Sequence, residues 1–261
     1  MISFNHLGNL GHLGNQMFQF AALVGLGAKH ERNFCIPPYE AFGKAYYQPL
    51  RSNIYDAFQP RAIKKLTKFP TLQEAHFHFD ENLFENLPEE DVNLYGFFQS
   101  EKYFAHCKDR VRDHFRFDKE TKSLATLMRQ QLSGKILGIH VRRTDYLTNP
   151  NHHSLGLDYY ERALAEMPDV TGVIFTDDTE WAMKQKLFPD ERFFVSEMTD
   201  PYIDLCLMSL CNYHIIGNSS YSWWGAWLAE SERVIAPKHW FAGDAAAHDT
   251  KDLYLPDWLV L

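Results

Sequence analysis

The sequence predicts an α/β protein of two lobes, each a parallel sheet covered by helices on both faces, with a cleft between the lobes. Short apolar stretches of strand length alternate with helical stretches, and the alternation restarts near Ser133-Gly134. The 261 residues are 45% hydrophobic and 23% charged, as in a globular protein. Alternation of this kind forms parallel sheets. We therefore expect lobes at residues 1–132 and 133–261.

In the first lobe, the apolar segment 2–7 predicts a strand, the glycine-rich segment 8–14 a turn, and the segment 16–29 a helix. The same patterns predict further strands at 33–36 and 92–98 and helices at 100–114 and 124–132. Between Ala41 and Glu90 the pattern is mixed and predicts no element.

In the second lobe, the segment Ile136 to Val141 is apolar enough for a buried strand. The alternation then continues to the end of the chain. Strands are expected at 173–176, 192–195, 214–217 and 234–236, and helices at 157–167, 179–187, 201–211 and 222–230.

Composition excludes several classes of function. The charge is 26 − 34 = −8, which does not favour a nucleic-acid partner. The chain contains neither a run of about 18 apolar residues nor a signal-peptide pattern, so we expect a cytoplasmic protein without an integral membrane segment. The four cysteines are scattered, and free thiols are expected rather than disulfides or a zinc site. The histidines lack metal-ligand spacing. Oligomeric state is not predicted.

The first motif that carries chemistry is the glycine-rich turn, whose glycines follow a G-x-x-G-x-x-G spacing. This spacing fits neither the dinucleotide fingerprint nor the P-loop. A strand end, small residues and a helix start let a ligand approach the backbone closely. Asn15 either caps the helix or points its amide into the cleft.

The second motif is His140-Val-Arg142-Arg143-Thr-Asp145, at the end of the strand expected at 136–141. Side chains alternate along a strand, so His140 and Arg142 share one face and Arg143 points away. We expect one arginine in the cleft and the other bound to the scaffold or to Asp145. A guanidinium carries a fixed charge and a fork of donors that match a phosphate. The alternative is a purely structural arginine–aspartate network.

The third motif follows the strand expected at 214–217 and opens a helix with hydroxyl groups. Hydroxyls and unpaired N–H groups at a helix start can bind an anion, and capping of the helix is the alternative. The polar members of this motif are Asn218, Ser219, Ser220 and Ser222. Core packing is expected for the tryptophans that follow at helical spacing, Trp223, Trp224 and Trp227.

The fourth motif is the doublet Asp177-Asp178, after the strand expected at 173–176. A carboxylate in this position can accept two N–H bonds from a guanine edge, or bind a metal ion. A helix cap at Asp178 or Thr179 is the alternative.

These motifs resemble the family 11 glycosyltransferases, the α-1,2-fucosyltransferases of the GT-B-like fucosyltransferase superfamily. The resemblance covers nearly the whole chain. The matching segments are Gly14-Asn-Gln-Met-Phe-Gln-Phe-Ala21, Gly96-Phe-Phe-Gln-Ser-Glu-Lys-Tyr-Phe104, His140-Val-Arg-Arg-Thr-Asp-Tyr146, Leu157-Asp-Tyr-Tyr-Glu-Arg-Ala163 and Asn218 to Leu228. It implies a GT-B-like fold of two Rossmann-like lobes, the first on the acceptor side and the second binding the nucleotide sugar.

The resemblance also implies an activity: inverting transfer of L-fucose from GDP-fucose to a glycan hydroxyl, here a galactoside 2-hydroxyl, without an essential metal or another cofactor. The Asp-x-Asp triplet usual in metal-dependent sugar transfer occurs nowhere in the chain. By this resemblance Arg142 binds the β-phosphate, His140 lies against the nucleoside, and Asp177, or Asp178, accepts from guanine. Phosphate donors come from Ser219, Ser220 and Ser222 beside Asn218, and Asn15, Gln16 and His12 lie on the sugar or acceptor side.

For catalysis, Arg142 stabilises the leaving diphosphate, and Asp145 is the candidate general base, although pairing with Arg143 would lower its pKa. Two alternatives stay open: a transferase using another nucleotide sugar, and a non-catalytic nucleotide- or glycan-binding module. Tyr46, Tyr47 and Trp240 can stack on acceptor sugars or be buried in the core.

Overall fold

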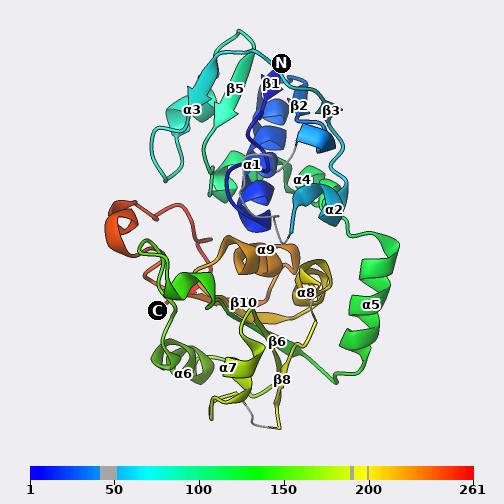
Figure 1. Ribbon diagram of the computed structural model, residues 1–261, viewed down its shortest axis with the longest axis vertical. Coiled ribbons are helices and arrows are strands. Elements are labelled where there is room, and N and C mark those ends of the chain that lie inside the picture. Colours follow the sequence, from blue (N-terminus) through cyan, green and yellow to red (C-terminus); the bar gives the residue numbers. More distant parts are fainter. Residues whose placement is uncertain (42–51, 189–190, 199) are drawn as a thin grey trace. The chain divides into compact units, whose positions relative to one another are not determined.

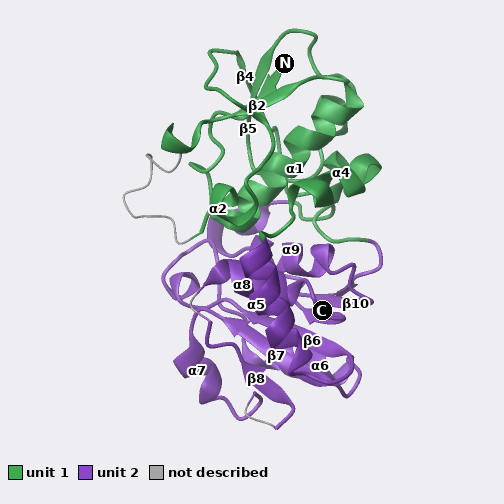
Figure 2. Ribbon diagram, turned by 90° about the vertical axis from the view of Figure 1, so that its right-hand side faces the viewer, with its two compact units in different colours: residues 1–118, 249–255 green, residues 119–248, 256–261 purple. Residues whose placement is uncertain are grey.

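The computed structural model describes residues 1–41, 52–188, 191–198 and 200–261 (Figure 1). The chain divides into two compact units, residues 1–118 with 249–255 (unit 1) and residues 119–248 with 256–261 (unit 2) (Figure 2). This division differs from the boundary expected at 132/133. Helix α5 (Lys119–Gln130) belongs to unit 2 because it packs against α8 (Pro201–Met208). The segment 249–255 belongs to unit 1, where Asp252 accepts from the backbone N–H of Phe79 (3.2 Å).

Unit 1 is built on a parallel sheet with the strand order β3-β2-β1-β5-β4, which confirms the parallel architecture expected for it. The first strand is shorter than expected because the chain turns after Phe4, whose carbonyl accepts from the N–H of Leu7 (3.1 Å). Among the described residues of the region where the sequence predicted no element, there are two strands and two α-helices. The strands are β1 (Ile2–Ser3), β2 (Phe34–Ile36), β3 (Ile63–Lys64), β4 (Thr71–Gln73) and β5 (Val92–Tyr95).

Helix α1 (Leu13–Lys29) is the central helix of unit 1. Its residues from Leu13 to Gly27 are buried on every side, with the exception of Asn15. An apolar surface all round is typical of a helix enclosed by other elements. The helix expected at 100–114 is instead three short pieces. The remaining helices of unit 1 are η1 (Tyr39–Ala41), α2 (Ile54–Phe58), α3 (Glu81–Glu85), η2 (Glu101–Tyr103), η3 (Ala105–Cys107) and α4 (Lys108–His114).

Unit 2 is built on a parallel sheet with the strand order β11-β10-β9-β6-β7-β8. Along the chain, β6, β7 and β8 follow one another toward one edge of the sheet. The next strand, β9, pairs with the other side of β6, and β10 and β11 continue toward the opposite edge, so the order reverses between β6 and β9. In open α/β sheets a ligand binds beyond the carboxyl ends of the strands at such a reversal. The strands are β6 (Ile136–Val141), β7 (Thr171–Thr176), β8 (Phe193–Val195), β9 (Tyr213–Ile215), β10 (Arg233–Ala236) and β11 (Leu259–Val260).

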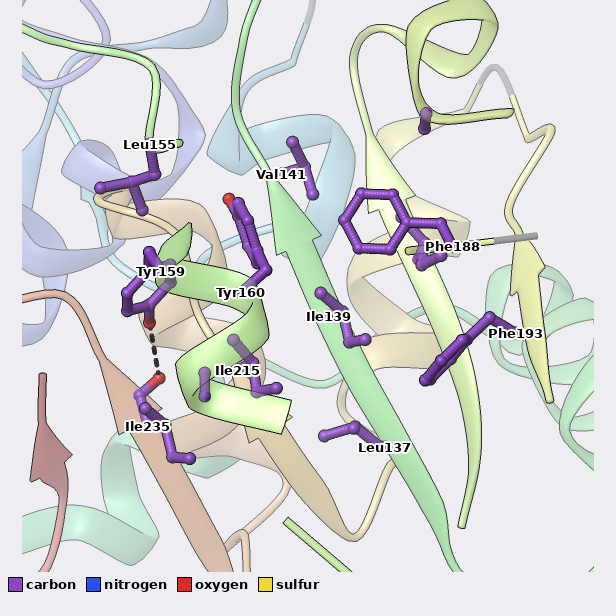
Figure 3. Close-up of a cluster of buried hydrophobic side chains, with 13 residues drawn as sticks. Leu137, Ile139, Val141, Leu155, Tyr159, Tyr160, Phe188, Phe193, Ile215 and Ile235 are labelled. Atoms are coloured by element: carbon purple, nitrogen blue, oxygen red, sulfur yellow. Dashed lines mark hydrogen bonds between the residues drawn. The ribbon is translucent and has the colours of Figure 1, made fainter. Parts of the chain in front are cut away.

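Helices cover both faces of the unit 2 sheet. Leu137, Ile139 and Val141 of β6 belong to a buried cluster with Tyr159 and Tyr160, which come from α6 (Figure 3). The alternate residues of β6 face the other way, and the ring of His140 lies 5.6 Å from that of Tyr221 in α9. Besides α5 and α8, the helices are η4 (Asp145–Leu147), α6 (Leu157–Ala165), α7 (Thr179–Met183), α9 (Ser220–Leu228) and η5 (Gly243–Ala247).

Two expectations about buried residues are confirmed. Trp223, Trp224 and Trp227 of α9 are all at most 3% exposed and pack ring against ring. Cys206 and Cys211 are free thiols in the interior. Among the helices in the described part of the chain, none combines the length and hydropathy needed to span a bilayer.

A partly buried carboxylate supports the loop that leaves β5 in unit 1. Glu74 follows β4, and its two oxygens accept hydrogen bonds from the backbone N–H groups of Phe97 (2.8 Å) and Phe98 (3.0 Å). Burial raises the pKa of Glu74 from 4.5 to about 7, and the two hydrogen bonds only partly oppose this effect. The folded protein therefore holds a proton that the unfolded chain releases at lower pH.

This pKa difference predicts a pH-dependent stability. Between about pH 4.5 and 7 the folded state binds more protons at Glu74, so the free energy of unfolding falls as pH rises, by about 3 kcal/mol at most. Urea unfolding of the wild type and Glu74→Gln at pH 5 and pH 8 measures this. The wild type is expected to lose stability relative to the variant. Equal changes in both proteins would contradict the prediction.

Candidate functional site

Two of the sequence motifs meet at the strand-order reversal of unit 2. His140 to Asp145 leave the carboxyl end of β6, and Asn218 to Ser222 connect the neighbouring strand β9 to α9. The parallel register of β6 and β9 brings both carboxyl ends to the same edge of the sheet. This edge is therefore the candidate site.

Arg142 lies at this edge with a guanidinium that is a quarter exposed. Its Nε donates to Asp145 Oδ1 at 2.8 Å, and its Nη1 lies 3.2 Å from Asp177 Oδ2. Burial by itself would lower the pKa of Arg142, but the charges of Asp177 and Asp145 outweigh burial and raise it. The group is a permanent cation.

Arg143 has a different role, as expected from strand alternation. Its Nε donates to Asp178 Oδ2 at 3.0 Å, and its guanidinium stacks 4.2 Å from the ring of Trp181. Arg143 thus ties the strand end to α7. One expected alternative was a pair between Arg143 and Asp145. Asp145 instead pairs with Arg142, three residues earlier, because the chain turns at η4.

The strand register explains both arginine–aspartate pairs. β6 and β7 pair in parallel with Val141 opposite Thr176, so the residues that follow continue opposite one another. Arg142 therefore meets Asp177, and Arg143 meets Asp178.

The carboxylates of Asp177 and Asp178 both already accept hydrogen bonds from backbone N–H groups. Asp177 accepts from the backbone N–H groups of Arg143 (2.8 Å) and Thr144 (3.2 Å), which have left the sheet and need acceptors. Asp178 caps α7 by accepting from the N–H of Trp181 (3.1 Å), so the capping alternative holds for this residue. Their expected contact with guanine stays a prediction.

His140 is enclosed and neutral. Burial, with Arg142 as a second cause, lowers the pKa of His140 to about 3. Its backbone carbonyl accepts from the hydroxyl of Tyr160 (3.2 Å), while its Nδ1 is buried without a hydrogen-bond partner among the described residues. A buried nitrogen of this kind is one that a ligand can satisfy.

The turn after β9 combines scaffold and anion-binding features. The Asn218 amide donates to the carbonyls of His153 (3.1 Å) and Trp240 (3.2 Å), and its Oδ1 is buried without a partner among the described residues. Ser219 is the N-cap residue of α9, and Ser220 is the first residue of the helix. The hydroxyl of Ser222 is fully buried and donates to the carbonyl of Ser219 (3.1 Å), and its expected role as a phosphate donor stays a prediction.

Tyr146 is a residue of the site that the motif analysis did not single out. Its ring lies 5.7 Å from the Arg142 guanidinium and stacks on His152 with centroids 4.5 Å apart. Its hydroxyl donates to the carbonyl of Asn218 (3.0 Å) and so joins the two turns of the site. The signal was available, because Tyr146 ends the matched His-x-Arg-Arg segment.

In unit 1, Asn15 is not the helix cap, because α1 begins three residues before the expected start and His12 is its N-cap residue. Asn15 Oδ1 accepts from Gln99 Nε2 (2.9 Å), and the His12 side chain is exposed. Gln16 is fully buried and hydrogen-bonded to the carbonyl of Gly11 (3.1 Å) and the N–H of Ile54 (3.0 Å), and its expected position on the sugar or acceptor side stays a prediction.

Three aromatic residues were expected either to stack on sugars or to be buried in the core. Trp240 is 3% exposed, which makes it a core residue, and Tyr46 and Tyr47 lie outside the described residues. Within the residues that the structure describes, no group of three or more His, Cys, Asp or Glu side chains is arranged to hold a metal ion.

The site in unit 2 thus has features that can bind an anionic group. Arg142 supplies a fixed charge with N–H donors, and α9 begins at the same edge of the sheet. A helix start beside a guanidinium favours a phosphate or diphosphate.

A family model described as Glycosyl transferase family 11 matches residues 2–261. The chain belongs to this family. It is 31% identical to an alpha-1,2-colitosyltransferase of Escherichia coli, over 88% of this chain and 90% of the relative. It is 22% identical to galactoside alpha-(1,2)-fucosyltransferase 1 of Bos taurus, over 95% of this chain and 73% of the relative. The protein is therefore a glycosyltransferase of a fucosyltransferase-type family.

Its fold resembles that of NodZ, an alpha-1,6-fucosyltransferase from Bradyrhizobium, in a crystal soaked with GDP-fucose. The TM-score is 0.57 at 15% identity, covering 91% of this chain and 94% of NodZ. This likeness confirms the GT-B-like, parallel α/β architecture expected of a family 11 glycosyltransferase.

Proposed function

We propose that this family 11 glycosyltransferase transfers L-fucose from GDP-fucose to the 2-hydroxyl of a galactoside, with inversion and without an essential metal. The observation that carries the proposal is the Arg142 guanidinium at the strand-order reversal, beside the start of α9. The GDP-fucose soaked into NodZ, which shares the fold, and the α-1,2 specificity in the names of two relatives support it.

In this proposal unit 2 binds the donor. The β-phosphate pairs with Arg142, with further donors from Ser219, Ser220 and the first N–H groups of α9. The neutral ring of His140 lies against the nucleoside, where its buried Nδ1 gains a partner. Asn218 supports the turn that presents the serines. Guanine is read at Asp177 or Asp178, whose bonds within the chain must then be rearranged.

The leaving group determines what the arginine does. As the bond from the sugar C1 to the phosphate oxygen breaks, negative charge grows on the diphosphate. A fixed cation and aligned N–H groups stabilise that charge without reorganising, and each well-placed donor is worth about 3–4 kcal/mol in the transition state. These groups supply the charge that a divalent ion supplies in other transferases.

Asp145 is the general base of the proposal. In an inverting displacement the acceptor oxygen attacks C1 from the face opposite the phosphate, and its proton passes to a carboxylate. In the structure Asp145 Oδ1 is paired with Arg142 Nε (2.8 Å). The diphosphate competes for the same guanidinium, so donor binding releases the half-exposed Asp145 for the acceptor.

The acceptor is assigned to the N-terminal part of the chain. Asn15 and His12 are the polar candidates there, since Gln16 is committed to the backbone. A galactoside is proposed because of the name of the bovine relative.

Transfer of colitose is a second candidate, because the relative with 31% identity is named for that sugar. Colitose is fucose without its 3-hydroxyl, and the phosphate-binding groups do not distinguish the two. The ratio of kcat/KM for GDP-fucose and GDP-colitose decides between them.

Replacing Arg142 tests the phosphate role. We expect Arg142→Ala to lower kcat for transfer from GDP-fucose by about 10²–10³, because it removes a donor to the leaving group. Arg142→Lys keeps the charge but loses the fork and should recover part of the activity. Arg162→Ala, at an exposed arginine of α6, is the matched control. Transfer by Arg142→Ala within tenfold of wild type would remove the phosphate role.

The two roles of Asp145 predict opposite effects of one substitution. Asp145→Asn should lower transfer by about 10²–10⁴, the usual contribution of a general base. The same variant should bind GDP at least as tightly as wild type, because the carboxylate no longer competes for Arg142. Calorimetry and initial rates measure the two effects, with Asp158→Asn on α6 as a surface control. Weaker GDP binding together with normal transfer would contradict both roles.

Metal removal tests the charge assignment. Asp177 and Asp178 are bound to N–H donors of the chain and do not form an open pair of ligands. Transfer should therefore stay within about twofold after dialysis against EDTA. Loss of turnover that Mn²⁺ restores would turn the doublet into a metal site and overturn the mechanism.

A further inference from the structure

The loop that follows β5 in unit 1 is strained and buried. Phe98 adopts a positive φ of +54° although it is a bulky residue that is 0% exposed. Such a conformation persists only where the surroundings hold it, and strained positions of this kind often serve a site. The loop belongs to a segment that matches the family, and the proposed function gives it no role.

Three side-chain contacts hold this loop in place. Glu74 accepts from the N–H groups of Phe97 (2.8 Å) and Phe98 (3.0 Å). Gln19 of α1 donates to the carbonyl of Gly96 (3.2 Å). A Cβ at Gly96 would lie 2.5 Å from the Cβ of Glu74, so a glycine is required for this approach.

The loop places the carboxamide of Gln99 against the carboxamide of Asn15. Gln99, which is 6% exposed, donates from Nε2 to Asn15 Oδ1 at 2.9 Å. On the other side, Asn15 Nδ2 occupies space over Gly11, where a Cβ would lie only 2.2 Å away. Gln99 thus holds the oxygen of the Asn15 carboxamide, whose nitrogen lies close to Gly11, on the one residue between Leu13 and Gly27 that is not buried.

We infer that Gln99 is a positioning residue for the transfer reaction: the strained 96–99 loop exists to hold Gln99 against Asn15 and so fix the Asn15 carboxamide for contact with a sugar hydroxyl. The inference rests on the proposed function, which puts Asn15 on the sugar or acceptor side. Gln99 itself touches no substrate. Its effect on transfer passes through Asn15.

A double-mutant cycle tests this coupling. Gln99→Met keeps the shape of the side chain and removes the donor. The kcat/KM for a β-galactoside acceptor is measured with GDP-fucose for the wild type, Gln99→Met, Asn15→Ala and the double variant. We expect a tenfold or larger loss in each single variant, GDP binding within twofold of wild type, and a double variant no worse than Asn15→Ala within twofold. Losses that multiply in the double variant would overturn the inference.

A control and a structural readout separate positioning from loop folding. Gln19→Met removes hydrogen bonds to the carbonyls of Gly96 in the same loop (3.2 Å) and of Leu10 (2.8 Å) but leaves the hydrogen bond between Gln99 and Asn15 in place, so it should lower the thermal midpoint while transfer stays within threefold. Equal losses of transfer in Gln19→Met and Gln99→Met would show that Gln99 only stabilises the loop, and would overturn the inference. A crystal structure of Gln99→Met should show the Asn15 carboxamide turned, and an unmoved carboxamide would contradict the inference even if the wild type transfers no fucose.

Discussion

The contact between Arg142 and Asp177 is the constraint on which the donor site depends. Two strands end side by side, and beyond the last sheet pairing their N–H groups need new acceptors. Asp177 accepts from the N–H groups of Arg143 and Thr144 and also faces the Arg142 guanidinium. One carboxylate therefore completes the end of the sheet and fixes a cation beside it. The next pair, Arg143 with Asp178, repeats the contact one residue further and anchors it to α7.

The two units use buried polar groups differently. In unit 2 the strand register places Asp177 opposite Arg142, so the cation at the edge of the sheet has a carboxylate partner. In unit 1 Glu74 holds a loop with two N–H donors and no arginine partner among its hydrogen bonds, and burial raises its pKa. The arginine–aspartate pairs of unit 2 suit the binding of a charged group. The loop that Glu74 holds in unit 1 suits the positioning of a neutral carboxamide such as that of Asn15.

The sequence predicted what depends on local pattern. The fully buried β6 has the expected bounds 136–141, because an apolar run of that length has few alternatives. The unequal roles of the two arginines also follow from strand alternation, whereas the order of the strands was not predicted. What failed depends on contacts between distant residues. The side chain of Gln16 accepts from the N–H of Ile54, and α5 packs against α8 and so belongs to the second unit. The strands between 41 and 90 are short and exposed, so they carry little periodic signal.

A crystal structure of the protein with GDP tests the central claim most directly. The account predicts a β-phosphate oxygen at about 3 Å from the Arg142 guanidinium, close to the first N–H groups of α9, with Asp145 no longer paired to Arg142. A diphosphate bound elsewhere, with that guanidinium still held by Asp145 and Asp177, would contradict it.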